Sequence, residues 1–194
     1  MSDTHDDFYT FVFRGLLTEE VLDKAGRKSV SLSGYHEEDI AKSLSIDRLD
    51  PDLVSEGKKM AVVYTAISAF ENSIRNLIVS VLLDQKKENW WKECVSDKIR
   101  KKASDRIKEE ENTKWHSQRG QDPIFYLDIG DLAKIFQQNW EYFEPYIKNL
   151  EWAKNIIEVI EKSRNVIMHG GLLEQNDIER IGIYLRDWVN QVGA

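Results

Sequence analysis

The sequence is poor in cysteine, proline and glycine, and it lacks a long uninterrupted apolar run. A single cysteine, Cys94, occurs among 194 residues, which excludes an intramolecular disulfide framework and a cysteine-based zinc cluster. A reducing, cytoplasmic compartment is therefore expected. Three prolines and ten glycines are few for a loop-rich β protein and favour long helices. No apolar run approaches the roughly 20 residues of a membrane span, and the acidic segment Met1–Asp7 is unlike a secretory signal, so no membrane association is expected.

The charge is negative overall and uneven along the chain. With 27 basic and 34 acidic residues the net charge is −7, which excludes a protein that coats nucleic acid through bulk positive charge. Residues 84–119 are the positive stretch, with 11 basic and 8 acidic side chains. Any contact with a polyanion is therefore expected there.

Apolar periodicity predicts helices along most of the chain, and no segment shows the alternation of a strand. Asp50 followed by Pro51 is typical of a helix start. Apolar residues then recur every three or four positions as far as Val81, which predicts a helix of about thirty residues with much of its surface buried. Because such a helix needs partners on several sides, the chain is predicted to be an all-α antiparallel bundle of four to five main helices.

Two regions are predicted, a short N-terminal helical extension over residues 1–49 and the bundle over residues 50–194. In the extension, short helices are expected between residues 8 and 26 and over residues 37–44. In the bundle, a charged helix is expected within residues 86–117 and a loop at residues 118–123. Further helices are expected from residue 128 or 130 to just before Pro145, and from Tyr146 to His169. The run Asn176–Glu179 resembles a capping box and is expected to start the last helix.

Three polar residues gather at the end of the helix predicted to finish at His169. Arg164, Asn165 and His169 are costly on a buried helix face. Asn165 and His169 are four residues apart and share a face, whereas Arg164 and His169 lie about 140° apart on a regular helix and converge poorly unless the last turn distorts. The following pair, Gly170 and Gly171, makes such a distortion easy.

The segment Arg164–His169 resembles the Arg-polar-x-x-x-His motif of the HEPN superfamily, whose members are α-helical bundle proteins. Tyr64–Ile78 resembles the long early helix of that superfamily. Residues 128–136, followed by Asn139, Trp140 and Phe143, resemble the middle helix of the subgroup found at the C-terminus of a nuclear RNA-surveillance endonuclease. Together the resemblance covers roughly residues 50–194.

The resemblance implies a metal-independent endoribonuclease that needs no cofactor, and a role as a toxin or phage-defence effector. The ribose 2′-hydroxyl attacks the adjacent phosphate and leaves a 2′,3′-cyclic phosphate. His169 would act as base or acid because imidazole titrates near neutral pH, and Arg164 would hold the phosphate charge. Asn165 would orient the histidine or the phosphate. The resemblance also implies a homodimer with a composite site, and an antitoxin or defence-system partner protein.

Other residues support a site or have purely structural explanations. Glu71 and Arg75 either form an intrahelical ion pair or place a carboxylate that orients Arg164 and His169. Arg164 also lies within reach of Glu161 on its own helix. A basic cluster with neighbouring tryptophans is either a solvated face or a surface for single-stranded RNA; it comprises Lys98, Arg100, Lys101, Lys102, Arg106 and Lys108, with Trp90, Trp91 and Trp115.

Two further functions remain open at this point. A HEPN-like bundle without activity would serve as a dimerisation or binding module for RNA, a nucleotide or a protein partner. A regulatory protein would use residues 1–50 to dock a partner. His5, His36 and His116 have no neighbours at metal-ligand spacing and are interpreted as surface histidines, and Cys94 is interpreted as a structural thiol.

Overall fold

The computed structural model describes residues 36–192, except residues 114 and 148. The chain divides into two compact units, Met1–Pro51 and Asp52–Ala194, and each is described by itself. In the first unit, helix α2 spans Glu37–Ser43 and a 3-10 turn, η1, spans Ile46–Arg48. The short helix expected over residues 37–44 is confirmed, and those expected between residues 8 and 26 lie outside the described residues.

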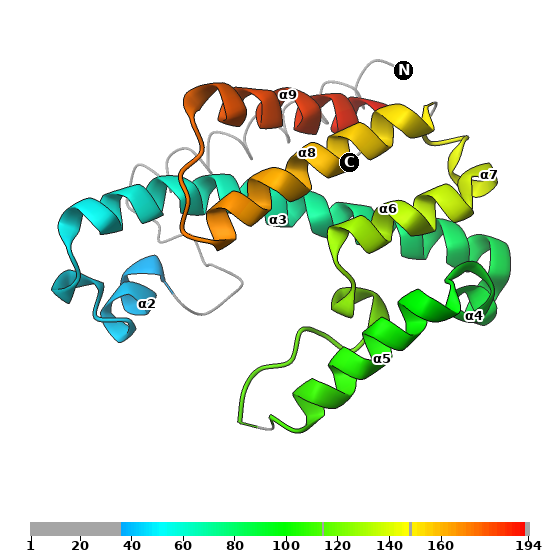
Figure 1. The fold of residues 1–194 in the computed structure, drawn as a ribbon, viewed down its shortest axis with the longest axis horizontal. Helices are drawn as coiled ribbons and strands as arrows, with labels where there is room; N and C mark the ends of the chain where they lie inside the picture. The colour runs from blue at the N-terminus through cyan, green and yellow to red at the C-terminus, as the bar shows by residue number, and fades with distance from the viewer. Residues whose placement is uncertain (1–35, 114, 148, 193–194) are drawn as a thin grey trace, which may run out of the picture. The chain divides into compact units, whose positions relative to one another are not determined.

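Helix α3, Pro51–Lys86, is the central element of the second unit (Figure 1). It is 36 residues long, and its apolar stripe is buried from Met60 to Leu82. Glu71 and Arg75 lie on the same buried face. Among the described residues, one helical stretch, Pro51–Cys94, is long and apolar enough by length and composition to cross a membrane. The core helix of a soluble protein passes the same test, and the buried side chains of α3 belong to the core cluster.

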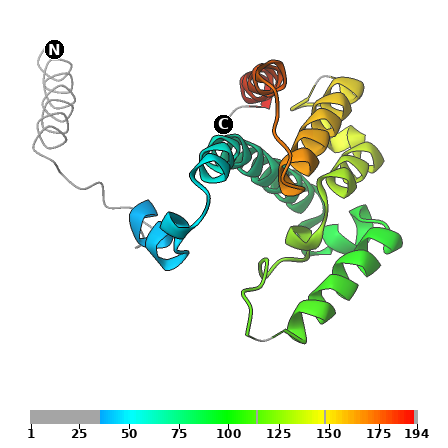
Figure 2. The same ribbon diagram turned by 60° about the vertical axis from the view of Figure 1, so that its left-hand side comes forward.

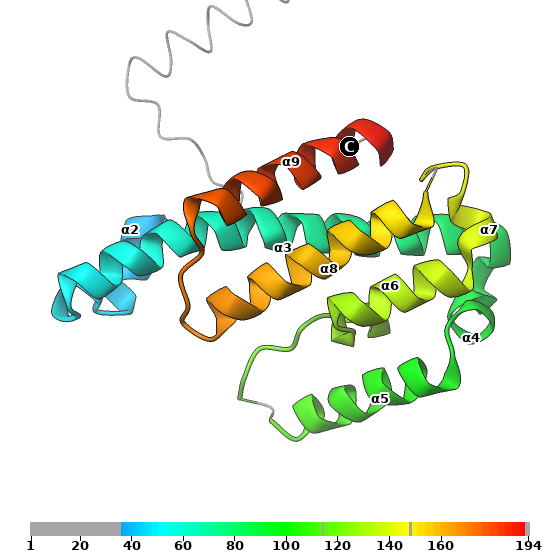
Figure 3. The same cartoon turned by 45° about the horizontal axis from the view of Figure 1, so that its top comes forward.

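Three helices cover one side of α3: α6 (Ile129–Gln138), α8 (Leu150–Met168) and α9 (Gln175–Val192). Figure 2 shows them grouped beside α3, and the colour ramp in Figure 3 shows that α8 runs antiparallel to α3, α6 and α9. Aromatic rings pack between the helices. The ring centroids of Phe70 in α3 and Trp188 in α9 are 5.2 Å apart. The described residues contain helices and no strand, so the predicted all-α bundle is confirmed.

The helix expected from residue 128 to Pro145 is broken, and that prediction was wrong. Helix α6 ends at Gln138, and α7 (Trp140–Phe143) follows. Asn139 between them has φ −123° and ψ 28°, outside the helical region. Its side-chain amide is buried and donates to the carbonyls of Cys94 and Ile135, both at 2.8 Å. The buried amide therefore ends α6 and ties it to the segment before α5.

Two other helix starts differ from the sequence prediction. Helix α8 begins at Leu150 because Asn149 caps it, with its side-chain oxygen accepting from the N–H of Trp152 at 3.0 Å. Helix α9 begins at Gln175, and the backbone N–H groups of Asp177 and Ile178 bond to the carbonyl of Glu174. Asn176 therefore lies inside the helix, and the expected capping box does not form.

The charged stretch folds as η2 (Lys87–Asn89), α4 (Trp90–Cys94) and α5 (Asp97–Glu111), followed by a loop and the turn η3 (Pro123–Tyr126). Only Ile99 and Ala103 of α5 are buried, so the expected solvated helix is confirmed. Trp90 and Trp91 pack against the core, whereas Trp115 in the loop is 84% exposed. Trp90 and Trp91 are therefore not free for base stacking.

Candidate functional site

The end of α8 is a tight glycine cap. His169 is the C-cap, with φ −97° and ψ 16°, and Gly170 follows with φ +75°. The N–H of Gly171 bonds to the carbonyl of Val166 at 2.8 Å, and that of Gly170 to the carbonyl of Ile167 at 3.0 Å, a Schellman arrangement. The chain therefore turns after His169, and the helix stays regular between Arg164 and its last residue.

A buried carboxylate joins α3 to α8. Glu71 Oε1 accepts from Arg75 Nη2 at 2.5 Å, and Glu71 Oε2 lies 3.4 Å from Arg164 Nε. The side chains of Glu71 and Arg75 are 10% and 9% exposed, and a buried charge needs such partners. Glu71 therefore forms the expected intrahelical ion pair with Arg75, and its second oxygen faces Arg164. The alternative pairing of Arg164 with Glu161 does not form among the described residues; Glu161 packs beside Gly130.

Arg75 is held on the side away from Arg164 by the segment around η3. Its Nε donates to the carbonyl of Ile124 at 3.4 Å, and Nη2 to that of Leu127 at 3.2 Å. Nη1 donates to Asn72 Oδ1 at 3.1 Å. The guanidinium of Arg75 is thus fully engaged, which makes it a tie between α3 and the η3 segment.

Arg164 is held at one end and free at the other. Its Nε is buried and faces Glu71 without a well-directed hydrogen bond. Its two terminal nitrogens make no hydrogen bond with any described residue. The side chain is 30% exposed. Because a guanidinium offers its terminal nitrogens as a planar fork, Arg164 is arranged to bind an anion from solvent.

The other two motif residues lie on the surface. Asn165 and His169 are exposed, and neither side chain hydrogen-bonds to a described residue; only the backbone N–H of His169 bonds to the carbonyl of Asn165. Within one chain, therefore, the structure does not bring Arg164 and His169 together. Exposed apolar side chains flank the motif, with Val166 40%, Met168 55% and Leu172 51% exposed.

The residues of the predicted basic cluster have different partners in the structure. Arg100 pairs with Asp97 and donates to the carbonyl of Lys92. Lys102 lies 2.6 Å from both Asp128 and Asp131, and Arg106 donates to Asp128 at 2.8 Å. Lys98, Lys101 and Lys108 make no ion pair with a described residue. Only these three keep an uncompensated charge.

Asp128 anchors this side of the bundle electrostatically. Burial raises the pKa of its carboxyl, but hydrogen bonds from Arg106 and Lys102 outweigh burial and lower the pKa from 3.8 to about 2. Arg106 also donates to the carbonyl of Tyr126 at 2.7 Å. The charge of α5 is thus partly used to fix the η3 segment in place.

The sequence analysis gave no role in this region to four residues: Asp128, Asp131, Lys134 and Gly130. The two aspartates neutralise part of the basic cluster, and Lys134 of α6 adds a cation 2.9 Å from Asp131. No sequence signal could have found the aspartates as partners, because they follow Lys102 by 26 and 29 residues. Gly130 allows α6 to approach α8: an added Cβ would lie 3.1 Å from Glu161 Oε1.

Among the described residues, no three His, Cys, Asp or Glu side chains gather where they could hold a metal ion. The arrangement places an arginine, backed by a buried carboxylate, and an exposed histidine near the end of one long helix. This arrangement agrees with the fold that the HEPN resemblance implies. Residues 65–193, which are 129 of the 194 residues, match the family described as Swt1-like HEPN. The chain belongs to that family, which confirms the predicted superfamily.

A comparison with curated proteins and one with solved structures found no match. The family supports a coarse functional class: HEPN domains include ribonucleases and modules that bind nucleotides, RNA or other proteins.

Proposed function

We propose that the protein is a metal-independent endoribonuclease whose catalytic residues are Arg164, Asn165 and His169. The observation that carries this proposal is the state of Arg164. Its inner nitrogen faces the buried Glu71, and its terminal nitrogens make no hydrogen bond with a described residue. A guanidinium backed in this way is oriented before it meets a ligand, and preorganised charge is what stabilises a phosphoryl transition state.

The chemistry follows from the residue types. The ribose 2′-oxygen bonds to the adjacent phosphorus, and the bond from phosphorus to the 5′-oxygen breaks. A base accepts the 2′-hydroxyl proton and an acid gives a proton to the leaving 5′-oxygen. His169 fills one of these roles, Arg164 neutralises the phosphate oxygens, and Asn165 orients either the histidine or the phosphate.

A homodimer would complete this site. Arg164 and His169 do not meet within one chain, and a second chain supplies both a second histidine and a partner surface. The exposed side chains of Val166, Met168 and Leu172 give that surface apolar area next to the motif, as a dimer interface requires.

The dimer is tested by mass and by complementation. Light scattering is expected to give twice the chain mass. Mixing the inactive variants Arg164→Ala and His169→Ala should restore part of the activity, because one mixed site then holds both intact residues. A monomeric, active protein, or mixed dimers with no restored activity, would contradict the composite site.

The enzymatic proposal is tested by comparing three variants in excess EDTA. Arg164→Ala and His169→Ala should abolish RNA cleavage while circular dichroism stays close to wild type. His169 is exposed, so Tm should not change for His169→Ala, whereas Arg164→Ala also removes the contact with Glu71 and should lower Tm without unfolding the protein. His116→Ala, at an exposed histidine of the loop after α5, is the matched control and should cleave normally. Equal activity in all three variants would exclude the motif as the site.

A toxin or phage-defence role in the cytoplasm, with a partner that restrains the enzyme, is part of the same proposal. Induced expression should arrest growth for wild type and for His116→Ala, but not for His169→Ala. Arrest by His169→Ala would separate toxicity from cleavage and remove the support for this role.

One observation favours a second function, that of a binding module without activity. Glu71, Arg75 and Arg164 together tie α3 to α8 and to the η3 segment, so a structural role accounts for all three of these polar residues. A folded, dimeric wild-type protein that binds RNA, a nucleotide or a protein but cuts no RNA would establish this function instead.

A further inference from the structure

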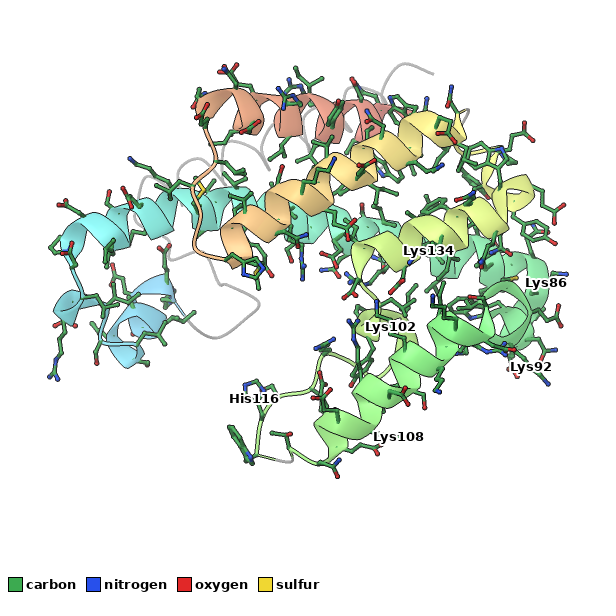
Figure 4. The ribbon with its side chains drawn as sticks, viewed as in Figure 1. Lys86, Lys92, Lys102, Lys108, His116 and Lys134 are labelled. Atoms are coloured by element: carbon green, nitrogen blue, oxygen red, sulfur yellow. The ribbon has the colours of Figure 1, made fainter. Side chains whose placement is uncertain are left out.

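Residues of α5 and α6 line a groove between these two helices. It encloses a cavity of about 640 Å³. Six of its lining residues matter here: Lys98, Ile99, Lys101, Lys102, Asp131 and Lys134. Lys102 of α5 and Lys134 of α6 both line this groove, and Figure 4 shows that Lys92 and Lys108 lie away from them, toward the two ends of the charged region.

The positive charge in the groove is only partly neutralised. Asp131 is shared by Lys102 at 2.6 Å and Lys134 at 2.9 Å, and Asp128 also lies 2.6 Å from Lys102, so these two lysines are largely neutralised and most of the excess charge comes from other lining lysines. Lys98 and Lys101 line the groove, are exposed, and make no ion pair with a described residue. The acidic lining residues Asp105 and Glu109 lie further along α5, so the excess of positive charge is at the end where α5 begins.

The floor of this end is apolar. Ile99 is 4% exposed and lies between Lys98 and Lys101 in the chain. Lysine stems add further aliphatic surface while their ammonium groups stay in water. Ammonium groups around an apolar floor fit a phosphodiester strand, whose phosphates are charged and whose sugars are not.

The groove and the candidate catalytic site are both bonded to the segment around η3. Arg75 donates to the carbonyl of Leu127, and Arg106, which lines the groove, donates to that of Tyr126. Arg75 is joined to Arg164 through Glu71. A chain of contacts therefore joins the groove to Arg164, through the carbonyls of Tyr126 and Leu127 and then through Arg75 and Glu71.

We propose that the α5–α6 groove binds the phosphate backbone of the RNA strand away from the cut, through Lys98, Lys101 and Lys134. This proposal rests on the proposed ribonuclease function. It revises the basic cluster predicted from the sequence. Arg100 is outside the groove, Lys102 contacts two aspartates, and Arg106 is held by Asp128. Lys134 is added from another helix because it shares a single carboxylate, that of Asp131, and its side chain is 62% exposed.

The test measures RNA binding in a background that cannot cut. Fluorescence anisotropy of a labelled single-stranded RNA oligonucleotide is recorded in EDTA with His169→Ala, across a salt series. Lys98→Gln/Lys101→Gln is compared with Lys92→Gln/Lys108→Gln, which removes the same charge from exposed lysines outside the groove lining. Lys134→Gln is measured alone.

The expected effect follows from counterion release. Each contact with a phosphate of a single strand contributes about 0.7 to the slope of log affinity against log salt. Two lost contacts lower the slope by about 1.4 and the affinity by about 25-fold at about 0.1 M salt. Lys134→Gln should cost about 5-fold by the same rule, and the control pair should stay within about 2-fold, as expected of lysines without a phosphate contact.

Equal losses in the groove pair and the control pair, or no loss in the groove pair, would overturn the proposal. The outcome is separable from the proposed function. If wild type cuts no RNA but the groove pair loses binding, the ribonuclease proposal fails and the groove stands. If wild type cuts RNA and both lysine pairs bind and cut alike, the groove fails and the ribonuclease stands.

Discussion

The buried carboxylate of Glu71 offers a quantitative test of how the site is built. We predict that Glu71→Gln destabilises the fold, because it removes the negative charge that lies 2.5 Å from Arg75 and 3.4 Å from Arg164. Glutamine keeps the size of the side chain and one acceptor oxygen. The loss is therefore electrostatic and leaves no cavity.

The expected loss of stability depends on the hydrogen-bond acceptors that Arg75 keeps in Glu71→Gln. Removing one partner of a buried ion pair costs about 3–5 kcal/mol when the other charge is left alone. Arg75 keeps three neutral acceptors, Ile124, Leu127 and Asn72, so the loss should approach that of one hydrogen bond to a charged group, about 2 kcal/mol. For a chain of this size, this corresponds to a Tm lower by about 4–8 °C.

The assay is thermal and urea unfolding, with a surface pair as control. Glu158 and Lys162 form an ion pair of the same i, i+4 spacing at 2.8 Å, but both side chains are more than 60% exposed. Glu158→Gln should leave Tm almost unchanged. If Glu71→Gln and Glu158→Gln shifted Tm equally, the carboxylate between α3 and α8 would not be the structural tie described here.

Three further predictions concern the surroundings of the site. Hydrogen bonds from Arg106 and Lys102 hold the pKa of Asp128 at about 2, so the contribution of this carboxylate to stability is present above about pH 4 and is lost as the pH falls toward 2. Asp128→Asn should lower the free energy of unfolding by about 1 kcal/mol at neutral pH, after discounting for the 44% exposure of the side chain. Urea unfolding of this variant should depend less on pH between about pH 4 and pH 2 than that of wild type. Gly171→Ala places a Cβ 2.9 Å from the carbonyl oxygen of Val166 and should cost about 1–3 kcal/mol, whereas Gly57→Ala, with no atom within 4 Å, should raise Tm; equal shifts would contradict the tight cap. Asn139→Ala leaves the carbonyl of Cys94 without its donor and should cost about 1–3 kcal/mol in urea unfolding, so an unchanged midpoint would refute its role in ending α6.

The main helices could be predicted because their apolar periodicity is a local property. The start at Pro51, the loop at residues 118–123 and the glycine cap after His169 all follow from neighbouring residues. The break at Asn139 could not be predicted, because its buried amide bonds to Cys94, 45 residues earlier. A stripe from Leu132 to Phe143 reads as one helix when that partner is unknown.

Part of the candidate site could also be predicted from the sequence, and part of it depends on how the helices pack. The spacing of Arg164, Asn165 and His169 is visible in the sequence, and so is the pairing of Glu71 with Arg75. The contact between Glu71 and Arg164 depends on how α3 and α8 pack, and the neutralisation of Lys102 depends on aspartates that belong to α6 and its N-cap. Local spacing therefore identifies candidate residues, and packing decides which of them keep a free charge.

The most direct test of the central claim is the analysis of product ends after RNA cleavage in excess EDTA. Wild type and His169→Ala are compared on an RNA substrate and on the same sequence made of DNA. The account predicts that only wild type cuts, only RNA is cut, and the fragments carry 2′,3′-cyclic phosphate and 5′-hydroxyl ends. Cleavage of DNA, 5′-phosphate ends, or full activity of His169→Ala would contradict it.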